Sequence, residues 1–212
     1  MRATTWVDRI TDEKNPWLNA QKMEERGEFG SAAALYLDDA SANLLSEKLA
    51  KAALSASCAA SCLDALGFSN EARLIYSEVA QLYYLHAGRV AKVSLREWMW
   101  SLRQSGEFHL VCGEAEKAQA VYKEYAVLAG RVELFGESRK LRLFEGELEP
   151  KLHSGPDNPP PGDWTELMRE VQRFLILRTT ARAKAPQQRG AQRGSAKGGY
   201  PNYEKNFANQ LG

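Results

Sequence analysis

Three cysteines and three histidines are the first candidates of this 212-residue sequence for metal binding or nucleophilic catalysis (Cys58, Cys62, Cys112, His86, His109 and His153). Cys58 and Cys62 are four residues apart, which places two thiols on one face of a helix, where they could bind a metal ion. No third cysteine or histidine lies near them in sequence, so two small buried side chains are the better interpretation. The histidines lack nucleophile partners in a recognisable motif, and the sequence contains neither a GxxxxGK[ST] phosphate loop nor His-Glu-x-x-His. We therefore expect a non-enzymatic protein without metal or cofactor.

The second chemical feature is a basic tail. Residues 151–212 contain 10 Lys and Arg against 5 Asp and Glu, whereas residues 1–150 contain 18 against 22. Two Arg-Gly pairs and nearby aromatic residues resemble segments that contact RNA by electrostatic attraction and base stacking. A solubilising tail or tether is the more common role of such a segment, and a short aromatic docking peptide is a third alternative. The candidate contacts are Arg189, Arg193, Lys197, Tyr200, Tyr203 and Leu211.

A repeated pattern indicates the elements that position these residues. A small residue followed by Gly, Ala, Tyr and Ala occurs three times, always at spacings of seven, five, four and four residues. The small residue allows a second helix to approach, the Gly ends the first helix, and Ala and Tyr lie on the packing face of the second. We therefore predict an all-α fold of stacked helical hairpins. The copies are Ala20, Gly27, Ala32, Tyr36 and Ala40; Ala60, Gly67, Ala72, Tyr76 and Ala80; and Gly106, Gly113, Ala118, Tyr122 and Ala126.

Capping and breaking residues set the expected helix limits. Asn15-Pro16 begins the first helix, Gly27 and Gly67 end helices, and Ser69 caps the helix that follows it. We expect a single helix over 44–66, small on nearly every side, which is suited to close packing or to a smooth groove for a partner helix. No segment has the alternation of a β-strand. The expected helices are 15–26, 28–42, 44–66, 69–86, 89–112, 114–129 and 131–149.

The composition divides the chain into four parts. A repeat domain is expected over 1–149, followed by a Pro-rich linker over 150–162 that cannot continue a helix. An amphipathic helix should begin at Asp163 as N-cap, with Glu166 at N3, and run to 185 as a capping or docking element. Residues 186–212 are poor in large aliphatic side chains and form the basic flexible tail. No membrane span and no secretory signal are expected, so a cytoplasmic location is predicted.

The repeated pattern resembles the tetratricopeptide repeat, in which small residues lie where two helices cross, a Gly forms the turn and an aromatic residue comes late in the second helix. The period here is 40 and then 46 residues, against 34 for that repeat. The longer units also resemble, more weakly, the SNAP adaptors, in which a penultimate Leu matters; Leu211 is penultimate here. The resemblance implies stacked hairpins with a concave face that binds another protein.

Large aromatic and basic residues are the candidates for such a partner contact. Trp98 and Trp100 lie on different faces of one helix, so that at least one is a candidate for exposure, although burial of both is the more common outcome. Arg103 is the only basic candidate on the inner helices, which argues against a clamp for a partner's C-terminal carboxylate. Trp164 and Phe174 are the candidates on the C-terminal helix.

Overall fold

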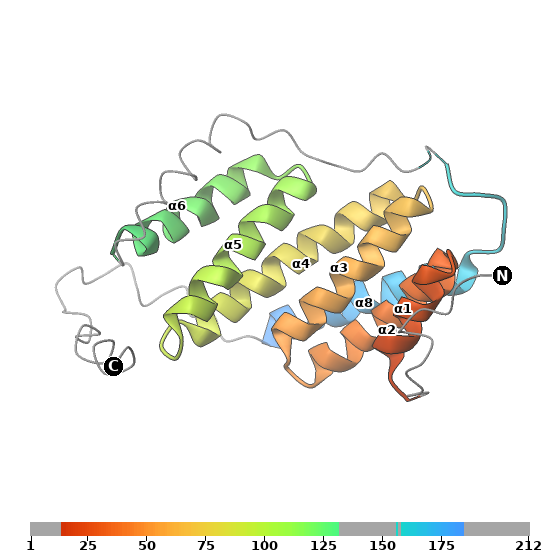
Figure 1. Ribbon diagram of the computed structural model, residues 1–212, viewed down its shortest axis with the longest axis horizontal. Coiled ribbons are helices and arrows are strands. Elements are labelled where there is room, and N and C mark those ends of the chain that lie inside the picture. Colours follow the sequence, from red (N-terminus) through yellow and green to blue (C-terminus); the bar gives the residue numbers. More distant parts are fainter. Residues whose placement is uncertain (1–13, 132–155, 157, 185–212) are drawn as a thin grey trace. The chain divides into compact units, whose positions relative to one another are not determined.

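The computed structural model describes residues 14–131, 156 and 158–184, and these residues are all-α, with seven helices and no strand (Figure 1). The chain divides into two compact units, Met1–Thr180 and Ala181–Gly212. The described helices are α1 (Pro16–Glu25), α2 (Phe29–Leu45), α3 (Leu49–Ala65), α4 (Ser69–Val90), α5 (Leu95–Val111), α6 (Ala115–Arg131) and α8 (Thr165–Lys184).

Each pair of consecutive helices from α1 to α6 packs together. Among the described residues, no helix is long and apolar enough to span a membrane. The expected helix over 131–149, most of the linker over 150–162 and the tail over 186–212 lie outside the described residues.

The glycines of the repeated pattern form the turns within the hairpins. Gly27, Gly67 and Gly113 have φ values of 78°, 86° and 78°, a conformation that glycine adopts without the steric cost of a Cβ atom. After each glycine, the backbone N–H of the next residue bonds to the carbonyl five residues before it, as in a Schellman motif. These bonds are Glu28 to Met23 (2.8 Å), Phe68 to Leu63 (2.9 Å) and Glu114 to His109 (2.7 Å).

The expected single helix over 44–66 is wrong, because the chain turns between α2 and α3. Glu47 adopts φ of 58°, and the N–H of Lys48 bonds to the carbonyl of Asn43 at 2.9 Å. This is the same hydrogen-bond pattern as in the glycine turns, formed here with a glutamate in the left-handed conformation. Composition could not indicate the turn, since no Gly, Pro or Asn marks it.

Four further helix limits, at α4, α5 and α8, differ from the expectation. Ser69 is the first residue of α4 and donates its hydroxyl to Asp64 at 3.0 Å, while Phe68 precedes the helix without a side-chain cap. Helix α4 continues through Gly88 to Val90, and α5 begins only after Ser94, whose hydroxyl accepts the N–H of Glu97 at 3.2 Å. Helix α8 begins at Thr165, one residue later than expected, and the carboxylate of Asp163 accepts the N–H of Thr165 at 3.0 Å.

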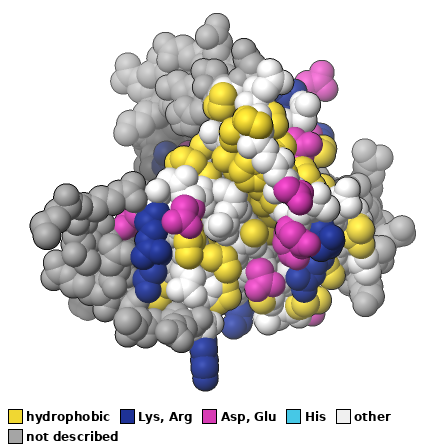
Figure 2. Space-filling model, turned by 90° about the vertical axis from the view of Figure 1, so that its right-hand side faces the viewer, with side chains coloured by type: hydrophobic (Ala, Val, Ile, Leu, Met, Phe, Trp, Pro, Cys, Tyr) yellow, Lys and Arg dark blue, Asp and Glu magenta, His cyan; other side chains and the backbone are white. Residues whose placement is uncertain are grey.

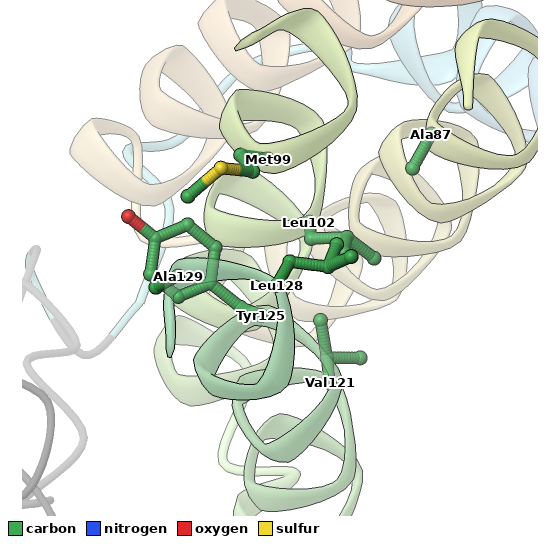
Figure 3. Packing of buried hydrophobic residues seen from close by; sticks show 7 residues of the cluster. All are labelled: Ala87, Met99, Leu102, Val121, Tyr125, Leu128 and Ala129. Carbon is green, nitrogen blue, oxygen red and sulfur yellow. The ribbon is translucent and has the colours of Figure 1, made fainter. Parts of the chain in front are cut away.

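The core consists of small residues at helix crossings and larger residues between them. Ala20, Ala32, Ala60, Ala72 and Ala118 are almost completely buried. At Gly106 a Cβ atom would lie 2.8 Å from the ring of Tyr122, so only glycine allows α5 and α6 to approach this closely. Figure 3 shows the cluster that joins the last three helices of the stack: Ala87 of α4, Met99 and Leu102 of α5, and Val121, Tyr125, Leu128 and Ala129 of α6.

Candidate functional site

The two tryptophans of α5 have different environments. Trp98 is half-buried and packs against the core cluster of Figure 3. Trp100 is 46 % exposed, and its ring meets the ring of Tyr83 edge-on, with centroids 5.4 Å apart. Arg103 is exposed, one turn further along α5, and pairs with Glu107 at 2.8 Å. Trp100 and Arg103 therefore lie on an accessible side of α5, whereas Trp98 belongs to the core.

An aromatic stack supports Trp100. Phe108 of α5 lies between the rings of Tyr76 and Tyr83 of α4, with both centroid distances 5.8 Å. Burial, with Cys58 nearby, raises the pKa of Tyr83 to about 12. Tyr83 thus contacts the rings of both Phe108 and Trp100 of α5, and these contacts limit the movement of the indole. Preorganised aromatic side chains lose little conformational entropy on binding.

Sequence reasoning missed a second exposed hydrophobic residue in the same register. Leu54 is 48 % exposed and lies six residues before Ala60, as Trp100 lies six residues before Gly106. The alignment of the repeats would have indicated it. We call the exposed sides of α3 and α5 the first-helix face; it comprises Leu54, Cys58 and Ser61 of α3 and Trp100, Arg103 and Glu107 of α5.

Exposure alone does not distinguish this face. Single exposed apolar side chains are common on protein surfaces, and Leu45, Leu74 and Val93 are also exposed. On the side of the molecule drawn in Figure 2, hydrophobic side chains lie among acidic and basic ones. Two features distinguish the first-helix face. Leu54 and Trp100 occupy the same position of successive repeats, and the ring of Tyr83 packs against Trp100.

The cysteines of α3 have the environment of packing residues. Cys62 is buried and Cys58 is half-buried, and neither forms a disulfide. Burial, together with the nearby carboxylate of Glu24, raises the pKa of Cys58 to about 11 and that of Cys62 to about 12. Both thiols are therefore protonated near neutral pH, which makes them poor nucleophiles.

The turn between α5 and α6 brings together a chemical cluster that sequence reasoning did not predict. His109, Cys112 and Glu114 place a ring nitrogen, a sulfur and a carboxylate oxygen within 4.8 Å of one another, and the signal for it was the spacing His-x-x-Cys-x-Glu. These are ligand types that zinc accepts. His109 Nδ1 lies 2.6 Å from Glu114 Oε2, and both His109 and Cys112 are buried.

The contacts of Glu114 favour a structural role for this cluster. Its Oε1 accepts hydrogen bonds from Lys117 at 2.5 Å and from Ser77 of α4 at 3.1 Å, while Oε2 contacts His109. A cation would have to displace the Lys117 ammonium and the His109 contact. Burial alone would raise the pKa of Glu114, but these hydrogen bonds outweigh it and lower the pKa to about 2. The ionised carboxylate of Glu114 thus links the turn between α5 and α6 to α4.

This network predicts a pH-dependent contribution to stability. In a His109→Asn background, which keeps a donor but removes the titrating ring, we expect Glu114→Gln to lower the free energy of unfolding by about 1–2 kcal/mol near neutral pH. The folded pKa of Glu114, about 2, lies below its ordinary value of 4.5. Its contribution is therefore complete above pH 4.5 and is lost as the pH falls toward 2.

Urea unfolding of the two proteins over this pH range measures the effect. Glu116→Gln, at an exposed position in the first turn of α6, is the control and should change little. A difference between the two proteins that stays constant on acidification would contradict the assignment of Glu114.

Trp164 and Phe174, the candidates for partner contact near the C-terminal helix, pack against other parts of the same chain. Phe174 is completely buried, so no partner can reach it in this arrangement. Trp164 precedes α8 and meets the ring of Phe68 edge-on at 5.6 Å. Its indole also lies against Gly30 of α2, where a Cβ atom would be only 2.6 Å away. Trp164 and Phe174 therefore contribute to packing between α8 and the hairpins.

Charged side chains hold α8 at two further points. Arg178 is 2 % exposed, and its Nε lies 3.1 Å from Oε2 of Glu78 on α4, as an ion pair without the alignment of a hydrogen bond. Arg173 lies 3.6 Å from Asp38 of α2, with both side chains half exposed. Helix α8 therefore contacts α2 and α4, the second helices of the first two hairpins.

The candidate tail contacts Arg189, Arg193, Lys197, Tyr200, Tyr203 and Leu211 lie outside the described residues, and the hypothesis of nucleic-acid binding stays a prediction. Comparison of the chain with protein-family models, with curated proteins and with solved structures gives no significant match. The resemblance of the repeats to known families therefore depends on the residues of the pattern alone.

Proposed function

We propose that this chain is a non-enzymatic adaptor that binds another protein through the first-helix face. The observation that carries the proposal is the pair Leu54 and Trp100, two half-exposed hydrophobic side chains at equivalent positions of successive hairpins. Arrays of helical hairpins offer extended surfaces of this kind to partners. Few residues dominate the energy of most interfaces, and Trp and Arg are enriched among them.

The chemistry of the face indicates the kind of partner. Trp100 offers an apolar ring, and Arg103 and Glu107 beside it offer charged groups of both signs. On α3, Ser57, Cys58 and Ser61 are small, so a partner helix or extended segment can approach the backbone closely there. An apolar segment with polar flanks fits this arrangement best.

The scaffold that we propose is of the tetratricopeptide type. In support, the three glycines with positive φ and the buried alanines occupy equivalent positions of the repeated pattern. The longer period of 40 and 46 residues also makes the SNAP adaptors a candidate family. Both families bind proteins through stacked hairpins, so the proposed function is the same for either.

Truncation of the two anchors tests the proposal. We expect Trp100→Ala, and more strongly the double variant with Leu54→Ala, to weaken binding of a partner captured from source-cell lysate by at least about tenfold, the effect of losing one interface anchor. Titration of the purified partner against each variant measures the loss. The control is Val93→Ala, which removes an 83 % exposed hydrophobic side chain between α4 and α5. Equal affinities of the anchor variants and the control would refute the first-helix face as the binding surface.

A further inference from the structure

We propose that the side of α2 and α4 beneath α8 is an exchangeable seat for an amphipathic helix, which a basic helix of another protein occupies when α8 leaves. We define the seat by the residues that contact the α8 segment: Gly30 and Asp38 of α2, Phe68 before α4, and Glu78 of α4. The seat lies on the second helices of the hairpins, so the proposal goes beyond the first-helix face and does not depend on it.

The most deeply buried side chains of α8 form one stripe, flanked by the half-buried Met168, Leu175 and Leu177. Leu167, Val171, Phe174 and Arg178 follow one another at spacings of four, three and four residues and are at most 5 % exposed. Such spacing places side chains on a single face of a helix. Thr165, Glu166, Arg169, Gln172 and Thr179, on the other sides, are exposed. Helix α8 is thus held from one side only, as a docked ligand helix is.

The connection to the rest of the chain allows α8 to leave without breaking the stack. Helices α1 to α6 pack in sequential order. Helix α6 ends at Arg131 and α8 begins at Thr165, so 33 residues (132–164) separate them. The contacts described for the α8 segment are with α2, α4 and Phe68, so its departure removes none of the contacts between consecutive helices from α1 to α6.

The buried ion pair specifies the helix that the seat prefers. Apolar residues at both position 78 and position 178 would continue the stripe and would stabilise docking at least as well as the ion pair does. Arg178 instead places a guanidinium against Glu78, and Arg173 places a second one near Asp38. The two charged groups regain their hydration when the helix leaves, which makes separation easier. A helix without the basic residue would leave the acidic side chain of the seat unpaired, so its binding is disfavoured. The acidic side chains of the seat therefore select a basic amphipathic helix.

Gly30 shapes the seat for an aromatic residue at the start of that helix, and Gly67 contacts the segment before it. A Cβ atom at Gly30 would lie 2.6 Å from the Trp164 ring, and Phe68 contacts the same ring edge-on. A Cβ atom at Gly67 would overlap the carbonyl of Pro156, just before α8. The expected occupant therefore has an aromatic residue, an aliphatic stripe and, fourteen residues after the aromatic residue, an arginine, as Trp164 and Arg178 are spaced.

A fluorescein-labelled peptide of residues 162–184 is the probe for the seat. In the full chain, Phe174→Ala with Arg178→Ala weakens the attached α8, so the probe should bind this variant at least about tenfold more tightly than it binds wild-type protein. Anisotropy titration measures the affinity, and circular dichroism shows whether the stack stays folded. The matched control is Arg169→Ala, because Arg169 pairs only with Glu166 of its own helix among the contacts described.

Charge reversal tests the specificity of the seat. Full-length Glu78→Arg should bind the probe that carries Arg178→Glu and reject the unchanged probe. Absence of probe binding to a folded variant would overturn the proposal, as would equal binding of both probes. Light scattering that shows dimers in which α8 is exchanged between copies would also overturn it, because the occupant would then be a second copy.

Hydrogen exchange on the wild-type chain keeps the proposal testable if the variants fail to fold. Amides of α8 should lose protection when excess probe is added, while those of α3 and α5 should not change. Unchanged protection of α8 under excess probe would overturn the proposal. None of these outcomes depends on Trp100 or Leu54, so failure of the seat and failure of the first-helix face are distinguishable.

Discussion

Replacing Arg178 with methionine should weaken the docking of α8 on the hairpins by about 3 kcal/mol, as expected when one partner of a buried ion pair is removed. The guanidinium is 2 % exposed, and without it the carboxylate of Glu78 keeps its buried position but loses its counter-charge. The methionine fills the volume but supplies no charge. The loss is limited by the free energy of docking, because α8 can detach once docking becomes unfavourable.

The double variant Arg178→Met with Glu78→Gln separates charge from packing. Its unfolding free energy should return to within about 1 kcal/mol of the wild-type value, since no unpaired charge remains. Urea unfolding of the wild type, both single variants and the double variant gives the coupling between the two residues. Proteolysis at the basic residues of α8 reports detachment directly. Additive effects of the two substitutions would contradict the role of the ion pair.

Alanine at Gly67 should be much more damaging than alanine at Gly27, although both residues have positive φ and the same place in the repeat. At Gly27 no atom lies within 4 Å of an added Cβ atom, so the expected loss is the conformational cost alone, about 1–2 kcal/mol. At Gly67 the added atom would overlap the carbonyl of Pro156 and lie 2.8 Å from the carbonyl carbon of Asn158. We expect a total loss of about 3 kcal/mol or more there, because rigid backbone must move.

Urea unfolding of Gly27→Ala and Gly67→Ala measures the two losses. The difference between them isolates the contact between the hairpins and the segment before α8. Hydrogen exchange should show faster opening of α8 in Gly67→Ala but not in Gly27→Ala. Equal losses in the two variants would mean that the segment before α8 moves aside without cost.

The all-α class was predictable from the sequence because its determinants are local. Gly27, Gly67 and Gly113 end helices by the same short-range geometry wherever they occur, and the pattern around them repeats in register. The turn at Glu47 was not predictable, since glutamate enters the left-handed conformation only where the surrounding structure compensates. The start of α5 at Leu95 was missed for a related reason: Gly88 continues α4, so the glycine does not mark the break.

The candidate sites were less predictable because they depend on contacts between distant residues. The sequence indicates that Trp98 and Trp100 differ, but only the position of Tyr83 determines which one is exposed and supported. Phe174 belongs to an apolar stripe in any helical interpretation, and whether that stripe faces its own chain or a partner is set by packing on α2 and α4. For the cluster at Glu114, one hydrogen-bond donor to the carboxylate, Ser77, comes from a different hairpin.

The order of contacts in the stack has a consequence for synthesis on the ribosome. Helices that pack on their neighbours in sequence can fold as they emerge, because few long loops need to close. The seat is complete once α4 has emerged, yet the last residue of α8 follows Val90 by 94 residues, up to Lys184. At ordinary elongation rates this interval lasts roughly 5–20 s. In a newly made chain the proposed seat is therefore formed before α8 can cover it, and during this interval a basic helix of another protein can bind without displacing α8.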